Sequence, residues 1–128
     1  MTADACMIFF SSVACDLRAG AAALRGYGLH VVEHNDRLVA CYEDSPQFVI
    51  RILSGPSVTA EAREIGAGTS HEAAMAKCDA RFDIEIEDLD EALDEINTLI
   101  EVQAALQEAS AGFLFTPWNG NLSELWKD

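Results

Sequence analysis

The chain has 128 residues, half of them apolar, and a formal net charge of −14 at pH 7. A chain of this length forms one domain and buries roughly two-thirds of its unfolded surface, so it can build a core without disulfides or a metal. The charge argues against binding nucleic acid, whose phosphates require Lys and Arg, and against an anionic membrane surface.

The N-terminal part of the sequence predicts a strand and then a helix. Residues 7–12 form a short apolar run, MIFFSS, which is typical of a buried strand. Residues 16–26 follow, and their apolar residues recur at spacings of four and three, the period of one helical face. Asp16 is a suitable N-cap for this helix. Gly26 and Gly28 are suitable terminators.

The next segment predicts a hairpin and a further strand. Residues 29–33 and 38–42 are two short apolar runs, and the polar pair Asn35-Asp36 lies between them. Such a pair between apolar runs indicates a tight turn that joins two antiparallel strands. Ser45-Pro46 interrupts the pattern, and residues 48–53, FVIRIL, predict another strand.

The middle of the chain predicts two short helices. The sequence Ser54-Gly55-Pro56-Ser57 is the clearest break in the chain, and it is followed by a helical segment that ends at Gly66 or Gly68. We expect Ser70 to cap a second short helix over residues 71–78.

A strand and a long amphipathic helix follow. Residues 81–87 alternate between an apolar face and a charged face, as in a half-buried strand. Asp88 and Glu91 match a capping box, and the apolar stripe after them predicts a helix to about Ser110. Residues 113–116 predict a last strand, and residues 121–128 predict one closing helical turn.

Helices and strands are mixed along the chain, which favours an α+β fold. We expect one domain over residues 1–128, with a single mostly antiparallel sheet and helices packed on one face. The split βαβ arrangement of ferredoxin-like domains is the nearest general model.

Acidic residues are concentrated between Phe82 and Glu108, where the chain has ten Asp and Glu and neither Lys nor Arg. Three interpretations are open: a solvated face, a docking surface for a cationic protein, or a cation site. The calcium-loop pattern needs a Gly at its sixth position, and this segment lacks it. The candidate partner-binding residues are Asp83, Glu85, Glu87, Asp90, Glu91, Asp94, Glu95 and Trp118.

The sequence lacks the common catalytic and phosphate-binding motifs, including GxxxxGK[ST], GxSxG and HExxH. No pair among Cys6, Cys15, Cys41 and Cys78 has the two-residue gap of a zinc knuckle or redox site. On a strand, His30 and His34 are about 13 Å apart, too far to share a metal. We therefore predict no catalytic residue, no metal and no cofactor.

These observations favour a non-enzymatic binding protein that docks a cationic protein. Immunity proteins, which neutralise basic nucleases, are an analogy based on charge and size only. The alternative is a small-molecule-binding domain or small enzyme, with a site near Ser12–Arg18 or the Trp118 loop. A homodimer formed through the sheet is compatible with either. The sequence shows no membrane span and no cationic segment before its first apolar run, so we expect a cytoplasmic protein.

Overall fold

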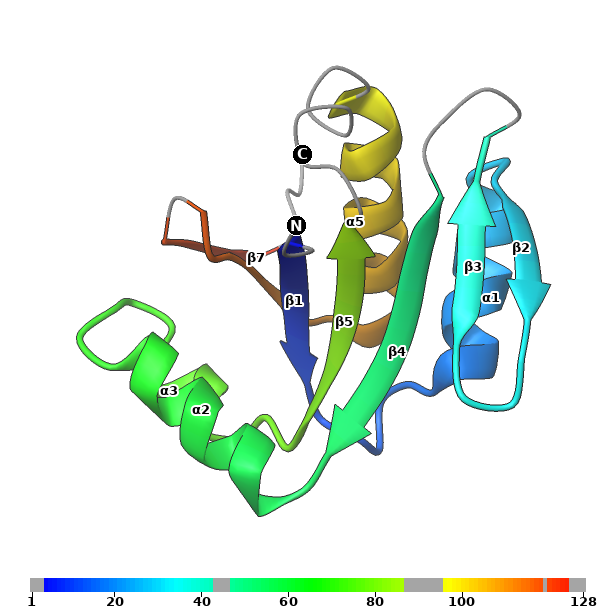
Figure 1. Cartoon of the computed structure of the whole chain (residues 1–128). Helices are drawn as coiled ribbons and strands as arrows, with labels where there is room; N and C mark the ends of the chain where they lie inside the picture. The colour runs from blue at the N-terminus through cyan, green and yellow to red at the C-terminus, as the bar shows by residue number, and fades with distance from the viewer. Residues whose placement is uncertain (1–3, 43–46, 87–95, 119, 125–128) are drawn as a thin grey trace.

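The structure, a computed structural model, describes residues 4–42, 47–86, 96–118 and 120–124. In these residues it contains one seven-stranded sheet and four helices (Figure 1). The strands are β1 (Asp4–Phe10), β2 (His30–Glu33), β3 (Leu38–Cys41), β4 (Phe48–Ser54), β5 (Ala80–Ile86), β6 (Phe113–Thr116) and β7 (Asn121–Glu124). The helices are α1 (Leu17–Gly26), α2 (Pro56–Gly66), α3 (Glu72–Met75) and α5 (Ile96–Ser110).

The strand order is β2-β3-β4-β5-β1-β6-β7, and each neighbouring pair is antiparallel. This arrangement confirms the predicted α+β class with a single antiparallel sheet. Strand β5 lies near the centre and pairs along its whole length with β1 and β4. Its apolar residues Phe82, Ile84 and Ile86 are buried, as the alternation predicted.

Helices α1 and α5 pack together on one face of the sheet and cover the main core. In this core the rings of Phe10 and Phe82 are stacked, with centroids 4.6 Å apart. Gly20 allows α1 to approach closely, because a Cβ at this position would lie 3.1 Å from Cδ2 of Leu106. The core therefore depends on a small residue where α1, α5 and β5 meet.

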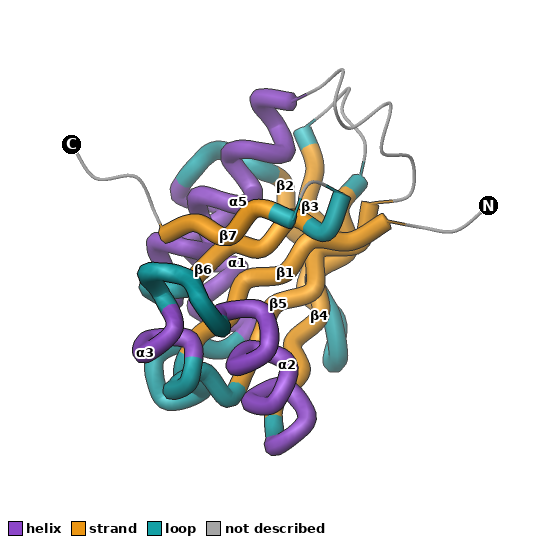
Figure 2. The backbone as a smooth tube through the Cα atoms, turned by 90° about the vertical axis from the view of Figure 1, so that its left-hand side faces the viewer, coloured by secondary structure: helices purple, strands orange, loops and turns teal. Residues whose placement is uncertain are grey.

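Helices α2 and α3 lie on the opposite face, where they pack on residues of β1, β6 and β7, and α2 also contacts β5 through Glu61 and Arg81. They enclose a second cluster around Phe9 and Met75. Figure 2 shows α1 and α5 together on one side of the strands and α2 and α3 apart from them. The predicted architecture placed helices on one face, and the structure adds this second pair. On this face α2 and α3 cover part of the sheet only.

Most predicted element ends agree with the structure to within a few residues. Asp16 is the N-cap of α1, as predicted, and its Oδ1 accepts a hydrogen bond from the Ala19 amide at 2.8 Å. The N-cap of α3 is His71 and not Ser70. The predicted helix over residues 88–110 is observed from Ile96, and its capping residues lie outside the described part of the chain.

The predicted closing helical turn is wrong at residues 121–124, which form β7. Gly120 has a φ of 67°, so the chain reverses direction there at a residue that adopts this conformation without strain. The reversal brings Asn121 opposite Thr116 and continues the pairing to Glu124. A turn with glycine in the left-handed region thus makes a hairpin of a segment that sequence reasoning took for a helix.

Strand β2 forms one outer edge of the sheet, and α1 protects it. The Arg25 guanidinium donates one hydrogen bond to the Val31 carbonyl at 3.0 Å and another to Glu33 at 2.9 Å. An edge carbonyl that already accepts a side-chain donor is less available to a strand from another molecule.

Candidate functional site

The structure describes three of the predicted partner-binding residues. These are Asp83 and Glu85 on β5 and Trp118 after β6. The other predicted contacts, Glu87, Asp90, Glu91, Asp94 and Glu95, lie outside the described residues. The acidic segment is thus described only at its two ends, on β5 and on α5.

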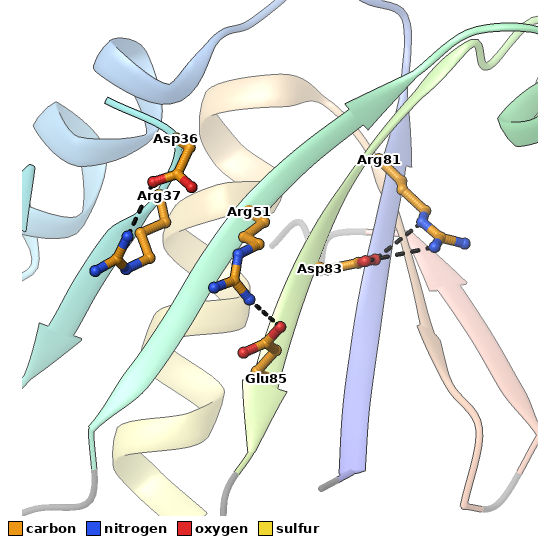
Figure 3. Close-up of polar contacts among 6 residues, drawn as sticks. All are labelled: Asp36, Arg37, Arg51, Arg81, Asp83 and Glu85. Atoms are coloured by element: carbon orange, nitrogen blue, oxygen red, sulfur yellow. Dashed lines mark hydrogen bonds and ion pairs between the residues drawn. The ribbon is translucent and has the colours of Figure 1, made fainter. Parts of the chain in front are cut away.

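The two carboxylates of β5 lie on the sheet face opposite the main core and are paired with arginines. Arg51 on β4 stands directly opposite Asp83 in the strand register, and it forms an ion pair with Glu85 (Figure 3). Arg81 lies two residues before Asp83 on the same face, and its Nε is 2.9 Å from Oδ1 of Asp83. Both acidic residues therefore have a cationic neighbour within the molecule.

Arg81 also contacts Glu61 of α2, so it links this helix to the sheet. The Arg81 and Asp83 side chains are only about one-fifth exposed. Burial raises the pKa of Asp83, and the adjacent Arg81 guanidinium opposes this rise. Asp83 thus makes a largely internal contact, with little of its carboxylate presented to a partner.

The acidic residues of α5 are held differently. The Tyr27 hydroxyl donates to Oε2 of Glu108 at 2.7 Å, and the Tyr42 hydroxyl donates to Oε2 of Glu101. These hydrogen bonds raise the pKa of each tyrosine, so both hydroxyls remain protonated donors at neutral pH. Both glutamates accept hydrogen bonds from neutral groups, and among the described residues neither forms an ion pair with Lys or Arg.

A shallow groove of about 500 Å³ runs between α1 and α5 beside Glu108. Its lining is mainly small apolar side chains, with the Tyr27 and Glu108 pair at one side. The lining residues are Ala19, Ala22, Ala23, Gly26, Tyr27, Glu108 and Ala109. This groove brings an apolar floor and a fixed carboxylate together on the outer surface of the helices.

Trp118 is half-buried and packs against the main core. The other alternative location, the loop before α1, forms a hollow of about 220 Å³ that includes Ser12, Cys15 and Asp16. Asp79 accepts hydrogen bonds from the Ser12 amide at 2.7 Å and from its hydroxyl at 2.8 Å. Asp16 caps α1. The polar groups at this loop therefore have partners that stabilise the fold.

The four cysteines are free thiols. Burial raises the pKa of Cys6 and of Cys78 to about 11, so these thiols stay protonated and are weak nucleophiles at neutral pH. Among the described residues no three His, Cys, Asp or Glu side chains are grouped closely enough to hold a metal ion. None of the described helices has the length and apolar character needed to cross a membrane.

Sequence reasoning missed the arginines that neutralise β5. Arg51 lies in an apolar strand, and Arg81 was assigned to the charged face of its own strand. Only the pairing of β4 with β5 shows that Arg51 lies beside Asp83 and Glu85. Arg81 was placed on the same face as Asp83 but was not recognised as its partner. It also missed the tyrosine partners of Glu101 and Glu108, because those contacts join residues 59 and 81 positions apart.

Comparisons with models of protein families, with curated proteins and with solved structures found no match to this chain.

Proposed function

We propose that this chain is a non-enzymatic binding protein that docks a cationic protein, with Glu101 and Glu108 of α5 among its contacts. One observation carries the proposal: both carboxylates accept hydrogen bonds from tyrosine hydroxyls, and neither has an ion-pair partner among the described residues. The carboxylates of β5 are paired with arginines, so we expect α5 to make most of the contacts with the cationic partner.

The tyrosine contacts orient the carboxylates before a partner arrives. A glutamate fixed by a hydrogen bond loses less side-chain entropy on binding than a freely rotating one. The net charge of −14 adds a long-range field that speeds encounter with a basic protein. Partner choice and association rate are the properties to which such electrostatic complementarity contributes most.

The groove between α1 and α5 suits a lysine or arginine side chain. The aliphatic stem of such a side chain packs on the alanines of the floor, while its charged head reaches Glu108. Ile100 is 50% exposed on the same helix and offers apolar contact next to Glu101. Charge and apolar area therefore lie together on α5.

The proposal places this protein and its partner in a reducing compartment. Four free cysteines are common in cytoplasmic proteins, where thiols stay reduced, and a cytoplasmic location suits a protein of this kind. Its role is to occupy or neutralise a basic surface of another protein.

The test uses pull-downs and titrations with the Glu101→Gln/Glu108→Gln double variant. Wild-type protein should retain basic proteins at about 50 mM salt and release them at about 500 mM, because salt screens exposed charges. The variant should bind a retained protein at least about tenfold more weakly, because it lacks two charge-assisted contacts. Isothermal titration of the purified partner against both forms measures the difference.

A Glu64→Gln/Glu72→Gln variant is the matched control. It changes the net charge equally, and its substitutions lie on α2 and α3, on the other side of the sheet. Equal losses in both variants would show that only total charge matters. Undiminished binding by the α5 variant would exclude α5 as the contact.

A further inference from the structure

The groove between α1 and α5, which lie on the same side of the sheet (Figure 2), is lined on its α1 side by one helical face. Residues three and four apart in a helix share a face, and this face consists of Ala19, Ala22, Ala23 and Gly26. The ten residues of α1 make it about 15 Å long. Because these side chains are no larger than a methyl group, a second helix can approach α1 to the axis separation of about 8–10 Å that packed helices adopt.

The walls of this groove favour a helix over an extended segment. Both walls are helices, whose backbone N–H and C=O groups are hydrogen-bonded within each helix except at the ends. An extended segment in the groove would have no strand edge to pair with, so its backbone groups facing the floor would lack partners. A helix satisfies its own backbone groups, and an amphipathic helix in a groove is a common mode of peptide recognition.

Two carboxylates lie at different points along the groove. Glu108 is part of its lining. Glu101 lies at the end formed by Tyr27, because the Tyr42 hydroxyl contacts Glu101 and also lies 2.9 Å from the Tyr27 carbonyl oxygen. The two glutamates are seven residues apart on α5, which is two turns on one face and about 10.5 Å along the axis. Helix α5 contains neither Lys nor Arg, so no cation of this helix lies between them.

We infer that this groove binds an amphipathic helix of the cationic partner, with Lys or Arg at positions i and i+7 opposite Glu108 and Glu101. Small or apolar residues of that helix pack on the alanines of α1. A helix aligned with α5 presents positions i and i+7 on one face at the same separation as the two glutamates, in either chain direction. The inference rests on the proposed function and adds the secondary structure and charge spacing of the segment that is recognised.

The test titrates the full chain with three synthetic peptides of about 18 residues, whose helices are marginal in isolation. The first has Lys at i and i+7 on a face of alanine and leucine. The second has the same composition with one Lys moved to i+5, about 140° around the helix. The third keeps the first spacing but has a central proline, which breaks the helix. Fluorescence anisotropy should show the first peptide binding at least about tenfold more tightly than the others, and circular dichroism should show it gaining helix on binding.

Ala22→Lys should weaken binding of the first peptide at least about tenfold, because it places a long cationic side chain in the groove. Ala60→Lys is the matched control, since it changes the net charge equally at another exposed helical alanine, on α2 at the other face of the sheet. Equal losses in the two variants would overturn the inference.

The outcomes separate this inference from the proposed function. Equal binding of the three peptides would mean that charge alone is recognised, which overturns the helix and leaves the proposed function in place. Failure of all three to bind would do the same if basic proteins are still retained through Glu101 and Glu108. If the Glu101→Gln/Glu108→Gln variant retains basic proteins as well as wild type does, the proposed function fails, and the helix inference fails with it.

Discussion

Asp79 shows how one exposed carboxylate can fix a loop. It precedes β5 and accepts two hydrogen bonds from Ser12, which follows β1, so it connects segments 67 residues apart in the sequence. These hydrogen bonds lower the pKa of Asp79 below its ordinary value of 3.8. A carboxylate whose pKa is lower in the folded state stabilises the fold at pH values above its ordinary pKa.

We therefore expect the stabilisation by Asp79 to be complete above about pH 5 and to disappear as the pH falls through its folded pKa. Urea unfolding of wild type and Asp79→Asn between about pH 2 and pH 7 measures this difference. The two proteins should differ at neutral pH and converge in acid. A difference that stays constant across this range would show that the charge of Asp79 has no part in the contact.

Ala111 has a φ of 55°, in the left-handed region, directly after α5 ends at Ser110. This position commonly holds glycine, because a Cβ is unfavourable there. Ala111→Gly should raise the free energy of unfolding by about 1 kcal/mol. Ala109→Gly, inside the last turn of the helix, should lower it by about the same amount. Denaturant titration of both variants compares them directly, and destabilisation by Ala111→Gly would contradict this account.

At the scale of elements, α1 depends on its N-cap. The Asp16 side chain accepts the Ala19 amide hydrogen bond, and α1 has no acidic residue in its first turn to assist it. Asp16→Ala should lower the free energy of unfolding by about 1 kcal/mol, whereas Asp16→Ser should retain most of it. Equal stability of the two variants would show that the cap contributes little.

The sequence predicted elements best where one local pattern was strong. The alternation of β5 and the cap of α1 identified both elements, because each depends on residues close together in the chain. The hairpin of β6 and β7 was missed, because Gly120 acts through its backbone angle and leaves no periodic signal. Sheet order was beyond prediction, because β1 pairs with β5 some 70 residues later.

At the candidate site, too, local features could be predicted and long-range contacts could not. Local composition identified an excess of acid between Phe82 and Glu108. Which of these acids are neutralised depends on long-range pairing: Glu85 forms an ion pair with Arg51 of β4, while Glu108 accepts a hydrogen bond from Tyr27, the C-cap of α1. A sequence shows how many charges a segment has, whereas the fold determines how many of them a partner can reach.

At the scale of the whole molecule, excess negative charge opposes folding. A net charge of −14 brings like charges close together in the compact state, and salt screens this repulsion. We expect the melting temperature to rise by a few degrees as sodium chloride increases from about 50 mM to about 500 mM. Scanning calorimetry measures the change. A fall would mean that the ion pairs of Arg51 and Arg81, which salt also weakens, outweigh the repulsion.

The hydrogen bond from Arg25 to the Val31 carbonyl affects how copies of this protein can associate through their sheet edges. If the β2 edge of one copy paired with the β7 edge of the next, the enlarged sheet would still have one free edge at each end. Further copies could then add without limit, which produces fibrils. With the Val31 carbonyl occupied, this route is obstructed at β2. Growth by strand addition therefore loses one of the two sheet edges that it needs, which favours a dispersed protein over an extended aggregate.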